Sequence, residues 1–428
     1  MGPRPEEDRR LSRTALAAPV LILIAGTVAL LWWKPAVQSP NVHLLADAAA
    51  SYLLVWGAVL LVSRRTPAET AKGFAVTTAT LLLLVGLLET AALGGVVDFR
   101  EVFARPLPEP WDNPGNVTDP VLLHIRKPHS DFVWNGVRYQ YDRNGFRNRE
   151  DSRAADVVVV GDSFMEGWEV PQDAMASSRL GRALGRRVVN LAQSGYGPQQ
   201  ELEVLRRFGL PLAPKVCIWG FFEGNDLGDV YRYEEARRNW GSLVGTPFSQ
   251  RSFLRNALPA VRRLTGLDEG AQESMKRMRN RSCLVREGDG RSVPMYFWYE
   301  GYFLSEKDEA SLREVRRLLR QAADLCRARG TDLLVVFIPV KYRVYRRAME
   351  CDTGAEPRYW VENALPGRLE AIVREAAPGA GYLDLTPPLA ARAGHGGLLY
   401  FPIDTHWTNA GHAVAAAEIA RDLERRSW

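Results

Sequence analysis

Residues 155–164, with the sequence ADVVVVGDSF, decide the fold of this chain. Four successive valines have the uninterrupted, β-branched apolar character of a strand that is buried on both faces of a sheet. The run ends in a glycine-bearing turn followed by Ser163, whose hydroxyl is then expected at the carboxyl edge of the sheet, near a helix N-terminus that favours developing negative charge. A Gly-Asp-Ser triplet alone is more often an ordinary turn, so the remaining chemistry must come from elsewhere in the chain.

Four more apolar runs follow, at residues 187–192, 215–221, 332–340 and 381–385. Helical periodicity predicts helices near residues 172–184, 198–208, 306–329, 366–376 and 408–426. Apolar strands without alternation, separated by helices, are typical of a parallel sheet that helices cover on both faces. The pattern therefore predicts an α/β fold, a three-layer α/β/α domain around a five-stranded parallel sheet.

Two later strands also end in residues suited to acyl-transfer chemistry. Gly195 lies in the segment that closes the second strand, where a glycine lets a backbone N–H approach a substrate oxygen without a side chain in the way. Asn225 follows the third strand, and its amide can donate a hydrogen bond to an oxyanion. Because Gly and Asn are also common turn residues, a purely structural role is the alternative for both.

The candidate base lies in residues 403–412, just before the last predicted helix. A serine nucleophile needs a general base with a pKa near neutrality, which histidine supplies, and a carboxylate that fixes the histidine tautomer. Asp404 lies two residues before His406, so this pair meets both needs. His412 falls inside the predicted helix and is expected to be a packing or surface residue. A structural or solvated role is expected for the remaining histidines, His43, His124, His129 and His395.

With these segments in this order, the chain resembles the SGNH/GDSL hydrolase superfamily, whose blocks supply serine, glycine, asparagine and histidine. The matching residues are Ser163, Gly195, Asn225 and His406, with Asp404 as the carboxylate of the last block. The strings SGYGPQQEL and GFFEGNDL around the glycine and the asparagine, and the lead-in NGFR at 144–147, carry the same resemblance. It covers about residues 140–425 apart from an insertion, and it implies a flavodoxin-like fold and chemistry without a cofactor.

The resemblance also implies a two-step mechanism. His406 takes the proton of Ser163, which attacks an ester carbonyl. The backbone N–H groups of Ser163 and Gly195 and the amide of Asn225 hold the oxyanion. The resulting acyl-serine passes its acyl group to water or to a sugar hydroxyl.

The last block departs from the usual pattern. Many superfamily members have Asp-x-x-His, whereas here Asp404, Thr405 and His406 are consecutive and are followed by Trp-Thr. This DTHWT string is similar to the SGNH-like domains of alginate-type polysaccharide O-acetyltransferases, which place the Asp-His segment before the serine. The string favours a glycan O-acyl substrate without establishing it.

Three long apolar stretches occupy residues 15–33, 44–62 and 74–97. Each has about the length that crosses the ~30 Å hydrocarbon core of a bilayer as a helix. Basic residues precede the first stretch and separate the second from the third, so the positive-inside rule places the N-terminus in the cytoplasm. We expect a three-helix anchor at 1–97 in the cell (inner) membrane and a periplasmic remainder. A cleavable signal peptide is the alternative for the first stretch.

Residues 98–154 are expected to form a proline-rich linker and a small β element before the SGNH domain at 155–428. Within that domain, the α/β pattern breaks at 227–305. This insertion contains 13 Arg/Lys and 9 Asp/Glu and ends in the aromatic string YFWYEGYF. An insertion after the carboxyl end of a strand lies where α/β enzymes bind ligands, so we expect a cap whose aromatics stack on sugar rings. The alternative is that they form the core of the cap or touch the membrane surface.

The four cysteines all lie in the part predicted to be outside the cytoplasm, where a disulfide is permitted. Cys217 lies in a predicted strand and Cys326 in a predicted helix, so both are expected to be buried thiols. Cys283 and Cys351 lie in segments expected to be irregular, and we predict that they pair. No cluster of cysteine and histidine indicates a metal site.

The leading functional hypothesis is a membrane-anchored esterase or O-acyltransferase that acts on cell-surface or exported glycan. The alternatives are a lipid-directed esterase or lysophospholipase, and a non-catalytic glycan-binding scaffold with the same fold. Three spans are too few to carry acyl groups across a bilayer alone, so a transferase would need a multi-span acyltransferase as partner. A net charge of +5 without long basic runs argues against nucleic acid.

Overall fold

A computed structural model describes residues 25, 27–28, 40–62, 67–103, 115–238, 251–264 and 269–428. The chain forms two compact units. The first comprises Met1–Leu107 and Ser242–Ser274, and the second comprises Pro108–Gly241 and Met275–Trp428. The predicted insertion at 227–305 is therefore divided between the two units, because its middle part belongs to the unit that contains the N-terminal helices.

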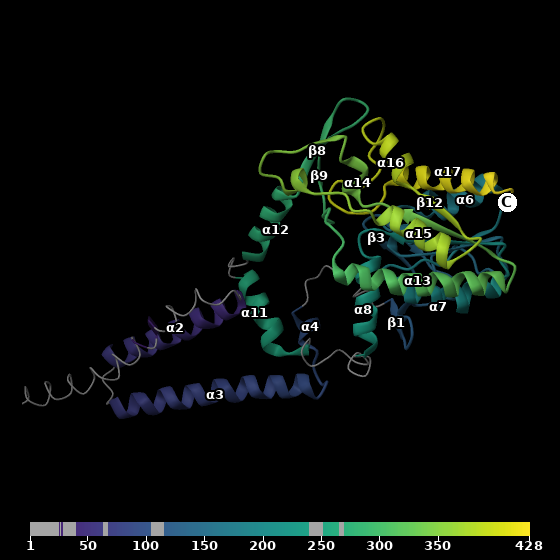
Figure 1. The fold of residues 1–428 in the computed structure, drawn as a ribbon. Coiled ribbons are helices and arrows are strands. Elements are labelled where there is room, and N and C mark those ends of the chain that lie inside the picture. Colours follow the sequence, from purple (N-terminus) through teal and green to yellow (C-terminus); the bar gives the residue numbers. More distant parts are fainter. Residues whose placement is uncertain are drawn as a thin grey trace, which may run out of the picture. The chain divides into compact units, whose positions relative to one another are not determined.

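The first unit contains the long apolar helices α2 (Pro40–Val62) and α3 (Pro67–Leu93), with α4 (Phe99–Val102) and α11 (Phe253–Leu264) (Figure 1). Among the described residues, one helix is long and apolar enough to cross a membrane, residues Ala68–Leu93 of α3, with a mean hydropathy of 1.9. Helix α2 covers the predicted stretch 44–62. The predicted stretch 15–33 lies outside the described residues, apart from residues 25, 27 and 28.

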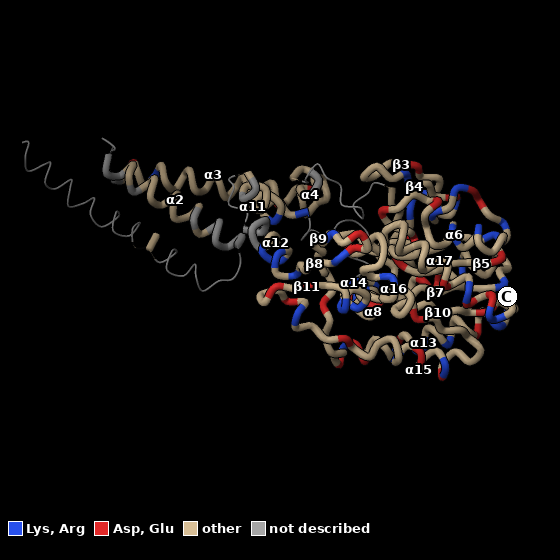
Figure 2. The backbone as a smooth tube through the Cα atoms, turned by 90° about the horizontal axis from the view of Figure 1, so that it is seen from above, with Lys and Arg blue, Asp and Glu red and all other residues tan. Residues whose placement is uncertain are grey.

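Polar contacts also link elements of the first unit. The Glu89 carboxylate on α3 accepts hydrogen bonds of 2.9 Å from the Ser252 hydroxyl and from the Leu254 N–H at the start of α11. Tyr52 on α2 and Thr78 on α3 share a hydrogen bond of 2.9 Å. In Figure 2, α2 and α3 carry few charged positions, in contrast to the many on the second unit.

The second unit is built on a five-stranded parallel sheet, as predicted. Its strands are β5 (Val157–Val160), β6 (Val188–Asn190), β7 (Val216–Phe222), β10 (Asp332–Ile338) and β12 (Gly381–Asp384), in the spatial order β12-β10-β7-β5-β6. In chain order this is 2-1-3-4-5, the flavodoxin-like arrangement. The strand order reverses between β5 and β7, which is where such folds bind ligands, at the carboxyl ends of the strands.

Helices cover both faces of this sheet, as the uninterrupted apolar strands require. One face packs against α7 (Pro198–Val204), α8 (Asp226–Arg238), α13 (Glu306–Arg327) and α15 (Leu365–Ala376). The other packs against α5 (Ser163–Glu166), α6 (Ala176–Leu184), α14 (Lys341–Tyr345), α16 (Thr386–Arg392) and α17 (Asn409–Arg425). In β5, Val158 and Val160 face the first layer while Val157 and Val159 face the second. Figure 1 shows α13 and α7 on one side of the sheet and α17 and α6 on the other.

Smaller antiparallel elements surround the sheet. The predicted lead-in element consists of two hairpins, β1 (Asn116–Asp119) with β2 (Leu123–Arg126), and β3 (Asp131–Trp134) with β4 (Val137–Gln140). After α12 (Glu269–Asn280), the insertion supplies β8 (Ser282–Arg286) and β9 (Ser292–Tyr296). These strands form a three-stranded sheet with β11 (Met349–Glu350).

The predicted cysteine pairing is confirmed, although the expectation of irregular segments is wrong for one partner. Cys283 lies in β8 and forms a disulfide with Cys351, which directly follows β11. The bond therefore joins two neighbouring strands of the three-stranded sheet. Cys217 in β7 and Cys326 in α13 are free, buried thiols, as predicted.

Candidate active site

Ser163 lies at the carboxyl end of β5, as the first residue of α5. The helix has only four residues and precedes the predicted helix near residues 172–184. Asp162 caps it, because its carboxylate accepts a hydrogen bond of 3.0 Å from the Phe164 N–H. Gly167 then closes the helix with a φ of +79°, in the left-handed region. These two caps fix a tight turn that presents the serine at the edge of the sheet.

The structure brings Ser163, His406 and Asp404 together from the two ends of the domain. The Ser163 Oγ atom lies 2.7 Å from His406 Nε2, and His406 Nδ1 lies 2.6 Å from Asp404 Oδ1. The same carboxylate oxygen accepts a hydrogen bond of 2.7 Å from the His406 backbone N–H. The geometry is that of a nucleophile, a base and a group that orients the base.

The ionisation of Asp404 suits this arrangement. Burial raises the pKa of the Asp404 carboxyl. The hydrogen bonds from His406 and the charges of His406 and Lys341 together lower this pKa by more than burial raises it, so the pKa lies below the ordinary value. Asp404 is therefore an anion at neutral pH. A carboxylate next to Nδ1 holds that proton in place and leaves Nε2 free to accept from the serine.

Two backbone N–H groups are the expected donors to an oxyanion, those of Ser163 and Gly195. Within the described part of the chain, no hydrogen bond from either N–H is found. Gly195 has a φ of +79°, so a side chain at this position would strain the backbone. The role of both groups in oxyanion binding stays a prediction.

Asn225 directly precedes α8, between β7 and that helix. Its side chain lies close enough to the carboxyls of Asp162 and Asp229 to lower the pKa values of both groups against the effect of burial. Asn225 is thus near the residue that caps the serine turn.

Asp162 and Asp229 belong to a cluster of four buried carboxyls, together with Glu201 and Asp226, a feature that the sequence did not predict. Burial raises the pKa of Asp162 to about 7 and that of Asp229 to about 6. Burial and the neighbouring carboxyls raise the pKa values of Glu201 and Asp226 well above the ordinary range. The cluster therefore retains protons at neutral pH. Its sequence signal was the acidic residues in the two strings around Gly195 and Asn225.

A further buried carboxylate supports the glycine loop. Glu166 at the end of α5 accepts a hydrogen bond of 2.6 Å from the Ser194 N–H, and it also accepts from the Ser194 hydroxyl. Its other oxygen accepts a hydrogen bond of 2.7 Å from the Tyr141 hydroxyl in the lead-in segment. Glu166 therefore links the serine helix, the segment before Gly195 and the lead-in element. The sequence did not indicate a role for Glu166.

The lead-in residues also brace the turn that follows the serine helix. Arg147, the arginine of the NGFR string, is buried and donates hydrogen bonds to the backbone oxygens of Gly167 and Val170. Gly145 has a φ of +79°, and a Cβ atom there would lie 2.1 Å from the Arg126 carbonyl oxygen. The NGFR string thus supports the turn after the serine helix and supplies no reacting group.

Glu169 is another residue that the sequence did not indicate. It has a φ of +61°, which is strained for a residue with a side chain, and such strain is common at functional sites. Burial and the nearby Asp404 charge raise the pKa of its carboxyl, and His406 and the Asn135 side chain oppose this rise. Glu169 and the turn of the β3–β4 hairpin therefore lie at the rim of the triad.

The other histidines near the site have structural roles. His412 is buried in α17, accepts a hydrogen bond of 3.2 Å from the Ala176 N–H, and has a pKa that burial lowers to about 3. His124 in β2 lies 3.2 Å from the Ser194 carbonyl oxygen and packs edge-on against Tyr196. Both support the site without contacting the Ser163 hydroxyl, as expected.

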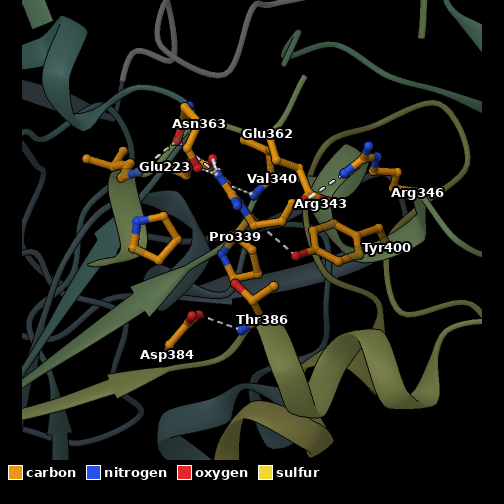
Figure 3. A network of polar contacts seen from close by, with 12 residues as sticks. Glu223, Pro339, Val340, Arg343, Arg346, Glu362, Asn363, Asp384, Thr386 and Tyr400 are labelled. Atoms are coloured by element: carbon orange, nitrogen blue, oxygen red, sulfur yellow. Dashed lines mark hydrogen bonds and ion pairs between the residues drawn. The ribbon is translucent and has the colours of Figure 1, made fainter. Parts of the chain in front are cut away.

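A buried ion pair fixes the neighbouring strand ends (Figure 3). The Glu223 carboxylate, just after β7, accepts hydrogen bonds from the Arg343 guanidinium, and their side chains are 5% and 8% exposed. Glu223 also accepts a hydrogen bond of 3.0 Å from the Val340 N–H, and Arg343 donates one of 2.9 Å to Asn363. Both charges are fully paired, so this network holds the ends of β7 and β10 together.

A cavity lies next to this ion pair, and no residue of the triad lines it. It has a volume of about 400 Å³. The core contributes Glu223, Gly224, Val340 and Asn363 to its lining, and the insertion contributes Arg277, Arg281, Trp298, Tyr299, Glu300 and Tyr302. The insertion thus forms one wall of this cavity.

These features define a serine esterase or acyltransferase domain of the α/β/α type, and comparisons with known proteins agree. Residues 294–428 match the ALGX family, described as "SGNH hydrolase-like domain, acetyltransferase AlgX". The probable alginate O-acetylase AlgJ of Pseudomonas putida is 30% identical over 119 residues, which are 28% of this chain and 29% of that protein. The chain thus matches less than a third of the length of this curated relative.

Solved structures show distant similarity. A GDSL-like lipase from Bacteroides thetaiotaomicron is 12% identical, with a TM-score of 0.32, over 63% of this chain and 88% of that one. TesA is 14% identical, with a TM-score of 0.34, over 63% of this chain and 98% of that one.

Residues 294–428 thus resemble an SGNH hydrolase-like domain, and the triad at the edge of the sheet agrees with this resemblance. The segment that matches the ALGX family contains Asp404 and His406, while Ser163, Gly195 and Asn225 precede it.

Proposed function

We propose that this protein is a membrane-anchored, extracytoplasmic serine enzyme that transfers or removes O-acetyl groups on cell-surface or exported glycan. The observation that carries the proposal is the hydrogen-bonded series from Ser163 through His406 to Asp404. The ALGX match over the DTHWT segment supports the acetyl group and the glycan as substrate class.

In the proposed reaction, His406 Nε2 accepts the Ser163 proton as Oγ attacks the acetyl carbonyl. Negative charge then develops on the carbonyl oxygen, where the N–H groups of Ser163 and Gly195 and the Asn225 amide stabilise it. His406 returns the proton to the leaving alcohol, and an acetyl-serine remains. A second alcohol or water then gives up a proton to His406 and attacks the acetyl-serine, which regenerates the Ser163 hydroxyl.

The proposed anchor consists of the three apolar stretches within residues 1–97, with the N-terminus in the cytoplasm and the catalytic unit in the periplasm. The length and hydropathy of α3 and the basic residues between the second and third stretches support this topology. A transferase in this position needs an acetyl donor on the outer side of the membrane. We infer that a multi-span acyltransferase supplies it.

The serine chemistry is tested by labelling the full chain with a fluorophosphonate probe. The wild type should be labelled, and Ser163→Ala should not be. An unlabelled wild type would contradict the assignment of Ser163 as nucleophile. Release of acetate from an acetylated glycan, measured with and without an acceptor oligosaccharide, then separates hydrolysis from transfer.

A further inference from the structure

The cavity next to the Glu223–Arg343 ion pair has the size of a ligand site. Its volume of about 400 Å³ falls within the roughly 300–1,000 Å³ typical of small-molecule sites. Its lining mixes aromatic rings with charged and amide groups, contributed by the insertion on one side and by the ends of β7 and β10 on the other. A fatty-acyl chain would bring apolar groups against this charged and amide lining and displace the water that hydrates it, so the lining disfavours a lipid tail.

Short contacts connect the lining of the cavity to the serine turn. Gly224 lines the cavity and directly precedes Asn225. The Tyr299 ring packs edge-on against the Phe222 ring with a centroid distance of 5.2 Å, and the centroid of the Phe222 ring lies 4.2 Å from that of Phe164, the residue after the serine. The rings of Phe222 and Phe164 therefore separate the lining residue Tyr299 from the serine turn, at a distance that neighbouring sugar residues of one glycan chain can span.

Gly224 makes this arrangement feasible because it has no side chain. A Cβ atom at this position would lie 2.6 Å from the Phe222 ring and 2.9 Å from the Tyr299 ring. The two rings thus pack directly against the backbone at the floor of the cavity. A side chain there would push the aromatic wall away from the core.

The insertion wall is held in place before any ligand binds. Arg281 donates hydrogen bonds to the carboxylates of Glu300 and Glu356, at 2.9 and 2.8 Å, and to the Trp298 carbonyl oxygen at 3.2 Å. The Cys283–Cys351 disulfide fixes β8 beside β11. A fixed wall loses little conformational entropy on binding, which favours recognition of a weakly binding group.

Two side chains of this wall remain accessible to a ligand. The Trp298 side chain is 60% exposed although it lines the cavity, and the Tyr296 ring packs edge-on against it at 5.9 Å. Arg277, on α12, is exposed beside it, and its guanidinium offers planar hydrogen-bond donors. A sugar ring has an apolar C–H face that stacks on an indole and hydroxyl groups that accept from a guanidinium.

We propose that this cavity binds a sugar residue of the acceptor glycan, with its ring stacked on Trp298 and its polar groups facing Arg277. The inference rests on the proposed glycan function and adds the place where the acceptor is held. In the transfer step, the sugar hydroxyl oxygen forms a bond to the acetyl carbon, its proton passes to His406, and the bond from that carbon to Ser163 Oγ breaks as Oγ takes the proton back.

The test uses the full chain in detergent micelles with p-nitrophenyl acetate as donor. Acceptors are a mannuronate oligosaccharide and, in a second arm, a cello-oligosaccharide; acetylated product is measured by mass spectrometry. Trp298→Ala and Arg277→Ala should each raise the acceptor KM about tenfold or more. Release of p-nitrophenol without acceptor should stay within about twofold of the wild-type rate, because the acetylation step does not use the cavity.

The matched controls are Phe303→Ala, an exposed aromatic of the same segment, and Arg279→Ala, an exposed arginine of the same helix; neither lines the cavity. Both should leave the acceptor KM unchanged. Wild-type transfer that Trp298→Ala and Arg277→Ala leave unaltered would overturn the cavity assignment alone. A wild type that cleaves the ester but acetylates neither oligosaccharide would overturn the glycan function together with it. A loss in Arg277→Ala confined to the mannuronate arm would identify a carboxylate contact within the cavity.

Discussion

The side-chain ammonium group of Lys341 donates a hydrogen bond of 2.5 Å to the backbone carbonyl oxygen of Asp404. The same nitrogen donates to the carbonyl oxygens of Phe401, at 2.6 Å, and Tyr296, at 2.9 Å. Lys341 is 3% exposed and begins α14 just after β10. It therefore fixes the loop that carries Asp404 to the sheet and to the insertion strand that precedes Trp298.

Replacing this lysine should impair catalysis without removing a group that contacts the substrate. Lys341→Met keeps much of the apolar stem but leaves the three carbonyl oxygens without their shared donor. A displacement of the Asp404 loop of about 1 Å is enough to lower kcat on the order of 10²-fold. We expect that loss in kcat for p-nitrophenyl acetate, with KM within about twofold. Lys215→Met, at an exposed lysine, is the control, and an unchanged kcat in Lys341→Met would show that the loop is positioned without the ammonium.

The same residue should make stability depend on pH in an unusual direction. Burial lowers the Lys341 pKa from 10.5 to about 7, although the Asp404 charge opposes the shift. Between pH 7 and about 10, the unfolded chain thus binds a proton that the folded chain does not, so this group's contribution to the unfolding free energy rises with pH by roughly 1 kcal/mol per unit. Denaturant unfolding of the wild type and Lys341→Met at pH 7, 8 and 9 measures it. The wild type should gain stability relative to the variant as pH rises; a constant difference would contradict the lowered pKa.

Asn225 lies near the buried carboxyls of Asp162 and Asp229 and is also the expected side-chain donor to the oxyanion, so its replacement tests which role matters for the reaction. If its amide stabilises the oxyanion, Asn225→Ala should lower kcat about 10²–10³-fold with little change in KM. The favourable effect of the amide on the charged forms of Asp162 and Asp229 predicts in addition a lower melting temperature. Steady-state kinetics and thermal unfolding of the same variant separate the two effects. A melting temperature that falls while kcat stays at the wild-type value would assign the side chain to structure alone.

The sequence predicted those site residues that lie at or just after the ends of strands. The valines of β5, the turn before Ser163 and the Asp404–His406 pair are each local patterns, and the parallel topology brings strand ends together at one edge. For this reason the sheet, and the contact between Ser163 and His406, could be predicted from the sequence.

The supports of the site could not be predicted in this way. The acceptors of Lys341 are backbone carbonyls of Tyr296, Phe401 and Asp404, which come from segments far apart and carry no sequence signal. The grouping of residues 242–274 with the N-terminal helices likewise depends on tertiary contacts such as that of Glu89 with Ser252. In each case the partner is defined by the fold and not by residue type.

The last prediction concerns Glu201 on α7. An acidic residue of a helix is ordinarily expected on the surface, but Glu201 is not. It is fully buried and accepts a hydrogen bond of 2.5 Å from the Trp219 indole N–H, while burial and the Asp162 charge raise its pKa well above 4.5. The folded chain therefore holds a proton that the unfolded chain loses near pH 4.5, so this group's contribution to stability falls as pH rises above that value. Glu201→Gln keeps an oxygen acceptor for Trp219 and removes the titration.

We expect the melting temperature of Glu201→Gln to exceed that of the wild type by an amount that grows between pH 5 and pH 8. Glu235→Gln, at an exposed position on α8, should follow the wild type throughout. Ester hydrolysis should be retained, because Glu201 contacts neither Ser163 nor His406. A difference in melting temperature between Glu201→Gln and the wild type that stayed constant from pH 5 to pH 8 would contradict the raised pKa. Glu201 would then be ionised within the core.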